Sequence, residues 1–324
     1  TSQDKFQIKM KILSSAAISA LNISPSTCVD WIKESFALKS QAQLPPKISL
    51  HPQGNDFFNT MPCLLPDPYN CYGVKIVRRI KGAEPSLISD MLLCDSRTGE
   101  SLALLDADWI TTMRTGAVAT LAIQTFRRRG EITYGFIGLG NTGRATLLCL
   151  LDAEPDVMHN VILLRYKDQA DLFAERFKDY ANVSFSICDD VKDLVSGSDV
   201  IVSCITEAQG LLCEDNECYK EGCLVIPVHT RGFQNCDLFF DKVYADDTAH
   251  VSGFKYFSHF KQFAEIQEVI EGVKPGRESD KERILSYNIG LGLHDVVFAS
   301  KIYSMLKGNA EKIEIKRFTE KFWI

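Results

Sequence analysis

Long apolar runs and an excess of basic residues are both missing from this sequence. No segment reaches the roughly 18 consecutive apolar residues that a membrane-spanning helix needs. The 36 Lys and Arg residues are outnumbered by 42 Asp and Glu residues, which gives a formal net charge of −6 at pH 7. Nucleic-acid-binding proteins depend on basic residues to neutralise phosphates. We therefore expect this protein to bind neither membranes nor nucleic acids.

Cysteine pairs with the two-residue spacing of structural zinc sites are also absent. Eleven cysteines, an odd number, lie between Cys28 and Cys236, and many sit in apolar runs where a free thiol packs as a small hydrophobic group. Cys213, Cys218 and Cys223 are separated by four residues each, which is not a zinc pattern. We expect reduced thiols, no bound metal and a cytoplasmic protein.

The opening segment KMKILSSAAISALNI superficially resembles a secretory signal, because Lys9 and Lys11 precede a run of small apolar residues. The run is rich in Ser and weakly hydrophobic, and it leads directly into the helix-start signal Ser24-Pro25. The segment is therefore expected to belong to the folded protein.

With 324 residues, of which 45% are hydrophobic, the chain is long enough for two domains. A helix is expected from Pro25, and it ends before LPPK at 44–47. Three β-like segments follow, around residues 56–59, 73–78 and 86–94, with turn signals between them that suggest a meander. The run from Asp108 to Arg129 predicts one long helix, which Gly130 ends.

From residue 131 onward, apolar strand patterns alternate with helical patterns. Strands are expected within 132–140, 160–166, 183–189, 198–206 and 222–230, with helices at 143–151, 169–180 and 190–195. The fold class is therefore α/β: a Rossmann-type doubly wound parallel sheet over 130–283, plus a smaller α+β domain. A last helix at 288–306 is expected to return to that smaller domain, which would comprise 1–129 and 284–324.

The segment GLGNTG places Gly138, Gly140 and Gly143 after a strand and at the start of a helix. This context is typical of a dinucleotide-binding loop. Gly138 permits the tight turn, Gly140 lets the backbone approach a pyrophosphate, and Gly143 lets helix and strand pack closely. Asn141 and Thr142 lie between these glycines, where the helix N-terminus would face phosphate groups. A glycine-rich turn without a ligand is the alternative.

The end of the second strand indicates which dinucleotide is bound. An NAD site usually carries Asp or Glu there, to bond the ribose 2′-hydroxyl. This chain reads VILLRYKD, so the first polar side chain is Arg165, with Lys167 close behind. Asp168 comes later and suits the N-cap of the next helix. The positive charge favours the 2′-phosphate of NADP, with NAD as the alternative.

Lys75 lies inside CYGVKIV, a short run of strand-forming apolar residues. A buried ammonium needs a partner, because desolvation otherwise drives it to the neutral form. The alternative is a lysine that faces solvent while Val74 and Ile76 point to the opposite face of the strand.

Three segments in this order, GVKIV, TTMRTGA and GFIGLGNTG, resemble the ornithine cyclodeaminase/μ-crystallin family. The resemblance extends over nearly the whole chain, from KILSSAAISAL to NIGLGLHD. It implies that the N-terminal domain binds substrate and forms a homodimer through its sheet, and that the Rossmann domain binds NAD(P).

The resemblance also implies roles for individual residues. Lys75 would face the nicotinamide, hold the carboxylate of an amino acid and assist proton movement. Arg114 and Thr115 would reach the cofactor phosphates and the substrate region, although Arg114 could instead be a helix-surface arginine. Further contacts to the dinucleotide are implied for Ser86, Thr206 and Asn288.

The sequence departs from the cyclodeaminases at three places. Lys47 replaces an arginine and Asn59 replaces a glutamate. Arg231 stands where they carry a catalytic aspartate, and an arginine cannot act as a base because it stays protonated. A similar arginine-containing loop occurs in relatives that make 2,3-diaminopropionate by an NAD-dependent oxidation.

His229, two residues before Arg231, stands at the end of a strand, where it could assist proton transfer or simply bond the backbone. His294 and Asp295 on the last helix are expected to be structural rather than a catalytic dyad.

The sequence therefore predicts an NAD(P)-dependent oxidoreductase that acts on an amino acid or its imine. Lys47 and Lys75 would bind the carboxylate, Arg231 a second anionic group, and Lys75 or His229 would handle the proton. One alternative is a redox-neutral ornithine cyclodeaminase, which forms proline and releases ammonia. Another is a crystallin-like protein that binds NADPH or a small ligand without turnover.

Overall fold

The computed structural model describes residues 7–316 and residue 322. The chain forms two compact units. Unit 1 comprises the described residues up to Ile23, then Glu34–Thr111, then those from Leu291 onward. Unit 2 comprises Ser24–Lys33 and Thr112–Gly290. The predicted α/β fold is confirmed, and each unit has its own sheet.

The observed boundaries differ from the predicted ones for three reasons. Residues from Thr112 onward belong to unit 2, because the later turns of the helix at 108–126 pack there. The start of the helix at Pro25 also belongs to unit 2, where the Ser26 N–H donates to Asp152 at 2.7 Å. The strand at 284–287 pairs within the sheet of unit 2, so these residues lie in unit 2.

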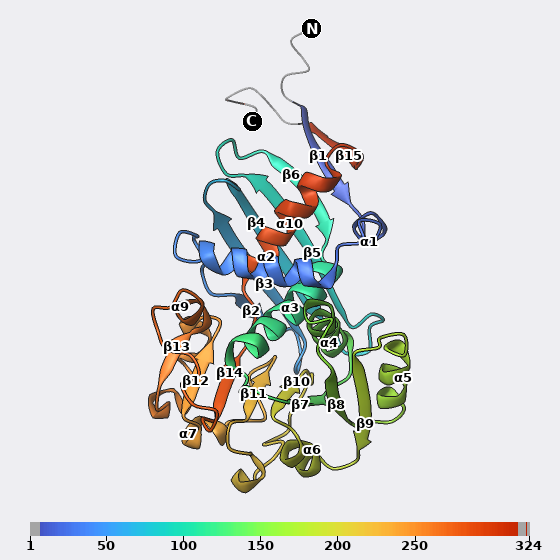
Figure 1. Cartoon of the computed structure of the whole chain (residues 1–324). Coiled ribbons are helices and arrows are strands. Elements are labelled where there is room, and N and C mark those ends of the chain that lie inside the picture. The colour runs from blue at the N-terminus through green and yellow to red at the C-terminus, as the bar shows by residue number, and fades with distance from the viewer. Residues whose placement is uncertain (1–6, 317–321, 323–324) are drawn as a thin grey trace. The chain divides into compact units, whose positions relative to one another are not determined.

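The described strands of unit 1 form a sheet in the order β15-β1-β6-β5-β4-β3-β2 (Figure 1). Their bounds are β1 Gln7–Leu13, β2 Ile48–Leu50, β3 Phe57–Leu65, β4 Cys71–Arg79, β5 Leu87–Asp95, β6 Ser101–Asp106 and β15 Glu311–Lys316. Strands β3, β4 and β5 correspond to the three predicted segments and pair in antiparallel register, which confirms the meander. Strand β6, which was not predicted, continues it. Strand β3 runs well past the predicted 56–59, through Pro62.

Four of the described α-helices have residues in unit 1. They are α1 (Ser15–Ser19), α2 (Pro25–Leu38), the first turn of α3 (Asp108–Phe126) and α10 (Gly292–Leu306). Helix α10 packs across β3, β4 and β5 (Figure 1). It starts four residues later than predicted, because Gly290 adopts a φ of +101° that no helix allows. Helix α3 ends at Phe126, three residues before the predicted Arg129.

The described strands of unit 2 form an eight-stranded sheet in the order β13-β12-β14-β11-β10-β7-β8-β9 (Figure 1). Every pairing in it is parallel. The bounds are β7 Thr133–Ile137, β8 His159–Leu164, β9 Val183–Cys188, β10 Val200–Ser203, β11 Leu224–Pro227, β12 Lys242–Ala245, β13 Phe263–Glu265 and β14 Ile284–Tyr287. The order reverses between β7 and β10, and this topological switch point is where α/β folds bind ligands.

The helices of unit 2 connect these strands. They are α4 Asn141–Ala153, α5 Gln169–Arg176, α6 Val191–Gly197, α7 Cys236–Phe239, α8 Thr248–Val251 and α9 Ile266–Ile270, together with the later part of α3. The first five strands agree with the predicted segments. Strands β12 to β14 were not predicted. The strands β10 and β11 are as short, but they read VIVS and LVIP, whereas β12, β13 and β14 read KVYA, FAE and ILSY and are less clearly apolar.

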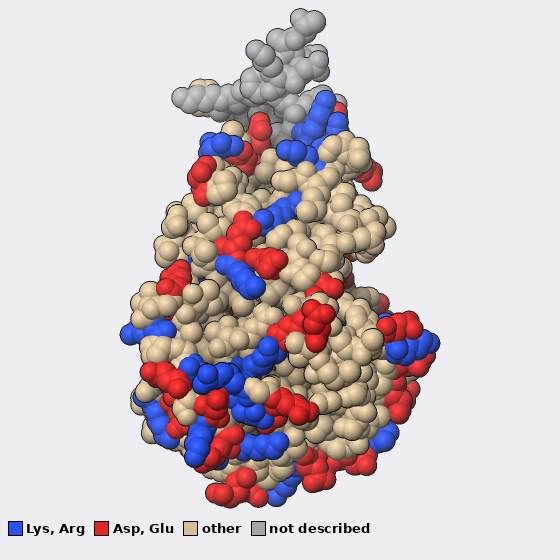
Figure 2. All heavy atoms as spheres, in the orientation of Figure 1, with Lys and Arg blue, Asp and Glu red and all other residues tan. Residues whose placement is uncertain are grey.

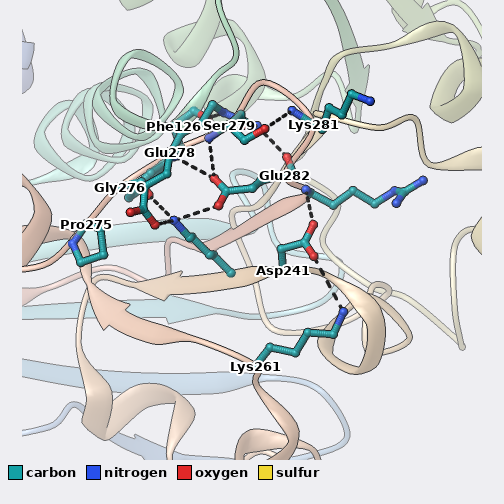
Figure 3. A network of polar contacts seen from close by, with 12 residues as sticks. Phe126, Asp241, Lys261, Pro275, Gly276, Glu278, Ser279, Lys281 and Glu282 are labelled. Carbon is teal, nitrogen blue, oxygen red and sulfur yellow. Dashed lines mark hydrogen bonds and ion pairs between the residues drawn. The ribbon is translucent and has the colours of Figure 1, made fainter.

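A buried lysine holds the start of β12 to the segment before β14. Lys242 donates to the carbonyl of Gly276 at 2.7 Å and to Glu278 Oε2 at 2.5 Å, and it lies 3.0 Å from Glu282 Oε1. Figure 3 shows the carboxylates of Glu278 and Glu282 pointing toward the same ammonium group. Since these residues lie where the strands begin, the network braces the edge of the sheet opposite the switch point.

Basic and acidic residues are intermixed on the face of the molecule in Figure 2. The basic triplet after α3 is paired: Arg127 with Glu154 at 2.8 Å, Arg128 with Asp199 at 2.9 Å and Arg129 with Asp280 at 3.5 Å. Among the described residues, no helix is both long and apolar enough to cross a membrane.

Helices α3 and α4 approach each other at Gly116. A Cβ atom on Gly116 would lie 2.4 Å from the carbonyl carbon of Ala145, inside the backbone of α4. Close helix packing at this point therefore requires glycine.

Replacing Gly116 with alanine is expected to lower the free energy of unfolding by about 2 kcal/mol, because the added methyl group forces the helices apart. In an unconstrained helix the same change raises the free energy of unfolding by about 1 kcal/mol. The sign of the change in stability therefore shows whether the close helix contact exists. Urea unfolding measures the effect. Gly253→Ala is the control, since a Cβ there meets no atom within 4 Å. A Gly116→Ala variant as stable as the wild type would contradict the prediction.

Candidate functional site

The loop between β7 and α4 lies at the switch point of the sheet in unit 2. Gly138 has a φ of +82°, and a Cβ on it would lie 2.6 Å from the carbonyl carbon of Cys204, just after β10. A Cβ on Gly143 would lie 2.8 Å from the carbonyl oxygen of Gly138. A Cβ on Gly140 would meet nothing within 4 Å. The first and third glycines are thus required by packing, whereas the second leaves open space over the loop.

The start of α4 provides donors and positive charge. Asn141 and Thr142 open the helix, whose first N–H groups have no acceptor within the helix itself, and its first turn carries no acidic residue. The Nε atom of Arg144 is buried and has no hydrogen-bond partner among the described residues. This arrangement suits the phosphates of a dinucleotide.

Asn288 follows β14 at the same edge of the sheet, where the strands end. It is buried, and its Nδ2 atom makes no hydrogen bond within the described part of the chain. Asp246 anchors the residues after it: Oδ2 accepts the N–H groups of Ile289 at 2.8 Å and Gly290 at 2.6 Å. The side chain of Asn288 is therefore a fixed donor still available to a ligand. Asp246 was not predicted, and nothing in its local sequence marks this role.

Arg114 lies on α3 and is buried, so the alternative of a helix-surface arginine does not hold. Its guanidinium lies against Gly290, where a Cβ atom would be 2.5 Å from Nη1. Thr115 follows it and is half-buried, whereas Thr206, after β10, is exposed.

Arg165 directly follows β8 and is half-exposed. Its Nε donates to Asp189 at 2.7 Å, and Nη1 lies 3.5 Å from Asp171. Lys167 adopts a left-handed φ of +52°, and its ammonium lies 5.4 Å from the centre of the Tyr166 ring. The two cations stand at the end of the second strand, where the ribose of a dinucleotide is bound in Rossmann folds.

Both ring nitrogens of His229 are engaged. The N–H of Arg231 donates to Nδ1 at 3.2 Å, and Nε2 lies 2.8 Å from the hydroxyl of Ser203, the last residue of β10. Since a backbone N–H can only donate, Nδ1 is unprotonated and Nε2 carries the hydrogen. Burial lowers the pKa of His229 to about 4. This geometry favours a neutral histidine that orders the loop over one that transfers protons.

Arg231 lines a surface cavity of about 350 Å³ together with residues 208–211, Gly232 and Gln234. The loop that carries it is rigidly built: Gln234 accepts the Gly232 N–H at 2.9 Å and donates to the Thr230 carbonyl at 3.0 Å. The Arg231 side chain is exposed, and it makes no ion pair or hydrogen bond within the described residues. A rigid loop that presents an available guanidinium is suited to binding an anion.

Lys75 lies at the centre of β4 in unit 1 and has no exposed surface. Its Nζ atom donates to Asp295 Oδ1 at 2.8 Å, and the side chain of Asp295 is also fully buried. The alternative of a solvent-facing lysine therefore does not hold. Val74 and Ile76 do point to the opposite, more exposed face.

Asn59 belongs to the same sheet as Lys75, and Lys47 directly precedes β2 of that sheet. Met61 of β3 pairs with Lys75, and Ile48, the residue after Lys47, pairs with Thr60. Asn59, two residues earlier on β3, has a buried Oδ1 atom without a hydrogen-bond partner in the described chain. Ser86, one residue before β5, is exposed, and its carbonyl accepts the Ile80 N–H at 2.9 Å.

The structure thus groups the predicted residues within each unit. At the switch-point edge of unit 2 lie the glycine loop, Asn288 and the Ser203–His229 pair. In unit 1, Lys75 is joined by Asp295, which the sequence placed beside His294. His294 instead contacts Ser35 at 2.5 Å through Nδ1. No group of three or more His, Cys, Asp or Glu side chains in the described residues could hold a metal ion.

Comparisons with known proteins agree with this geometry. The sequence model of the ornithine cyclodeaminase/mu-crystallin family matches residues 9–310. An alanine dehydrogenase of Archaeoglobus fulgidus is 27% identical over 320 residues, covering 91% of this chain and 95% of the relative. An N-((2S)-2-amino-2-carboxyethyl)-L-glutamate dehydrogenase of Staphylococcus aureus is 25% identical over 227 residues, or 66% of each chain. A solved archaeal alanine dehydrogenase dimer with bound NAD gives a TM-score of 0.79 at 26% identity, covering 94% of this chain and 99% of that one.

The lowered pKa of His229 predicts a specific pH dependence of stability. In the unfolded chain His229 takes up a proton below about pH 6.5, whereas in the folded protein it is protonated only below about pH 4. The stability contributed by neutral His229 is present above pH 6.5 and is lost as the pH falls toward 4, by up to about 3 kcal/mol.

Urea unfolding at pH 7.5 and pH 4.5 tests this, with His229→Asn as the comparison because its amide oxygen can still accept the Arg231 N–H. The wild type should lose more stability than the variant. Asp237, whose pKa burial raises to about 6, titrates in both proteins and cancels in the difference. Equal losses would contradict the prediction.

Proposed function

Because the chain belongs to the ornithine cyclodeaminase/mu-crystallin family, we propose that it is an NAD(P)-dependent oxidoreductase acting on an amino acid or its imine. The observation that carries this proposal is the glycine loop at the switch point. Its open space over Gly140 and the unpartnered donors of Arg144 and Asn288 fit a bound dinucleotide. The alanine dehydrogenase neighbour of known structure contains NAD.

When bound, the nicotinamide would supply or accept a hydride. Gly138, Gly140, Asn141, Thr142 and Gly143 would hold the pyrophosphate through backbone groups. The remaining cofactor contacts proposed are those of Ser86, Arg114, Thr115, Thr206 and Asn288.

NADP is the proposed cofactor and NAD the second candidate. Arg165 and Lys167 would pair with a 2′-phosphate, in competition with Asp189 and Asp171, which already contact Arg165.

The chain's own residues would bind the substrate and move the proton. Lys75 would hold the α-carboxylate and exchange a proton at its ammonium, and Lys47 would add a second positive charge. Arg231 would bind a further anionic group of the substrate in the cavity that it lines. His229 is proposed to act through its contacts to Arg231 and Ser203, because both of its nitrogens are engaged.

The loop after β11 argues against a redox-neutral cyclodeaminase. It carries no carboxylate between Val228 and Cys236, so the loop itself supplies no base of that kind. A ligand-binding protein without turnover remains the other candidate. All eleven cysteines are free thiols, which suits the proposed cytoplasmic location.

The outer face of the sheet in unit 1 supports a homodimer. Pro62, Val74, Leu92 and Leu104 form one row across four strands, in register and partly exposed. Ile76 and Phe58 lie on the same face and are exposed. An uncovered apolar surface of this kind is typical of an interface. Since the alanine dehydrogenase neighbour is a dimer, the proposed occupant is a second copy of this chain.

The function is tested by following reduced-cofactor fluorescence with NADPH and NADH while amino acids and cyclic imines are screened. Turnover is expected, with NADPH preferred and with substrates that carry two acidic groups used best. Arg231→Ala should lower kcat/KM for those substrates roughly 10- to 100-fold, because a charge-assisted contact is lost, and leave monocarboxylates unchanged.

Arg129→Ala is the matched control, since Arg129 lies outside the cavity. Net turnover excludes the redox-neutral reaction, and cofactor binding without any turnover would support the ligand-binding alternative. Equal effects of Arg231→Ala on substrates with one and two acidic groups would contradict the role proposed for Arg231.

The dimer is tested by light scattering on the purified protein. The wild type should have twice the 36.3 kDa mass of the chain. Leu104→Glu should shift it to the monomer, because two-fold symmetry brings both new carboxylates into one interface. Leu172→Glu, at an exposed site on α5, should leave it dimeric. A monomeric wild type, or a dimeric Leu104→Glu variant, would contradict this interface.

A further inference from the structure

The ion pair between Lys75 and Asp295 joins residues 220 positions apart in the chain. Neither side chain has any exposed surface, and Nζ of Lys75 lies 2.8 Å from Oδ1 of Asp295. Burying a lone ammonium or a lone carboxylate is costly, so each ion depends on the other. A contact of this kind forms only where the fold brings the two elements tightly together.

Two glycines allow this approach of α10 to the sheet. A Cβ on Gly73, two residues before Lys75 on β4, would lie 2.7 Å from a methyl group of Val296, the neighbour of Asp295. A Cβ on Gly292 would lie 3.1 Å from the carbonyl oxygens of Met61 and Pro62 on β3. The helix therefore rests directly on the backbone of the strands around Lys75.

Helix α10 is also fixed from its other side. His294, next to Asp295, contacts the hydroxyl of Ser35 on α2 at 2.5 Å, and its ring stands edge-on to Phe36 with centroids 4.7 Å apart. With α10 seated on the strands and pinned to α2, the Asp295 carboxylate has little freedom to leave Lys75.

The strands beside Lys75 place apolar side chains next to it. On the strands beside Lys75, Met61 and Met91 are its register partners. Burial, the neighbouring Cys71 and the Asp295 carboxylate together raise the pKa of the Cys63 thiol to about 12, and burial raises the pKa of the Cys71 thiol to about 11. Both thiols are therefore neutral at physiological pH.

We infer that Asp295 is the positioning residue for Lys75: it keeps the ammonium charged and aimed before substrate arrives. Its catalytic meaning rests on the proposed function, in which Lys75 binds a carboxylate and moves a proton. Since Lys75 has no exposed surface, a substrate reaches it only after a local rearrangement, and Asp295 serves as its counter-ion until then. A neutral lysine would neither attract a carboxylate nor donate a proton as readily.

The first experiment observes the charge of Lys75 without any substrate. In protein labelled with ¹⁵N-lysine, the Nζ signal of Lys75 is identified by its loss in Lys75→Met. The wild type should show an ammonium at pH 7. Asp295→Asn should convert it to the neutral amine or move its titration to lower pH, while Asp295→Glu should retain the ammonium. Asp108→Asn, which removes another carboxylate of unit 1, is the control and should leave the signal unchanged.

The second experiment is a double-mutant cycle on turnover. Asp295→Asn should lower kcat/KM roughly 100-fold, as expected when a reacting group is misplaced. In the Lys75→Met background the same change should cost less than about threefold, because Asp295 acts through Lys75. Asp295→Glu should recover part of the loss. A fall in kcat indicates a role in moving the proton, whereas a rise in KM alone indicates carboxylate binding.

These experiments separate the two possible failures. If Asp295→Asn leaves the Lys75 ammonium and its titration unchanged, the inference is overturned whatever the activity. Equal losses of kcat/KM in both backgrounds would also overturn it, since Asp295 would then act independently of Lys75. If the signals respond as expected but no substrate is turned over, the pairing stands and the proposed function fails.

Discussion

The buried contact between Lys75 and Asp295 is the constraint on which unit 1 depends. A strand lysine and a helix aspartate can share an interior site only if each neutralises the other. This requirement accounts for the glycines at 73 and 292, which bring α10 onto the backbone of β3 and β4. It also accounts for the fixing of α10 through His294, Ser35 and Phe36. One side of the sheet is thereby closed by α10, and its opposite face remains available for a second chain.

Unit 2 shows a different design, in which backbone geometry creates the binding capacity. The parallel sheet reverses its order at β7 and β10, and Gly138 and Gly143 allow the loop there to pack without side chains. Hydrogen bonds hold the neighbouring loops in place. Asp246 accepts the N–H groups of the segment after β14, and His229 contacts the Ser203 hydroxyl at the end of β10. Rigid loops with a few available donors lose little freedom when an anionic ligand binds.

Much of the fold was predictable, because long elements leave strong periodic patterns. The parallel strands β7 to β11, the meander strands β3 to β5 and the glycine loop agreed with their predicted segments. Several helix ends differed, and the strands β1, β2, β6, β12, β13, β14 and β15 were not predicted. Helix α10 starts late because Gly290 adopts a left-handed φ of +101°, and Asp246, more than forty residues earlier in the chain, accepts the N–H groups of Ile289 and Gly290. Strand β14 joined unit 2 because strand pairing is decided by neighbours in space rather than in sequence.

The candidate site was predicted residue by residue but not as a set of contacts. Local sequence determined that Lys75 sits within an apolar strand and that Gly138, Gly140 and Gly143 open a helix, because both patterns depend on residues a few positions apart. Only the tertiary structure decided that Asp295 faces Lys75, that His229 is held neutral between Ser203 and Arg231, and that Arg231 lines a cavity. Such contacts depend on how segments far apart in the sequence pack together. The residues that adjoin each of these side chains in the sequence do not determine that packing.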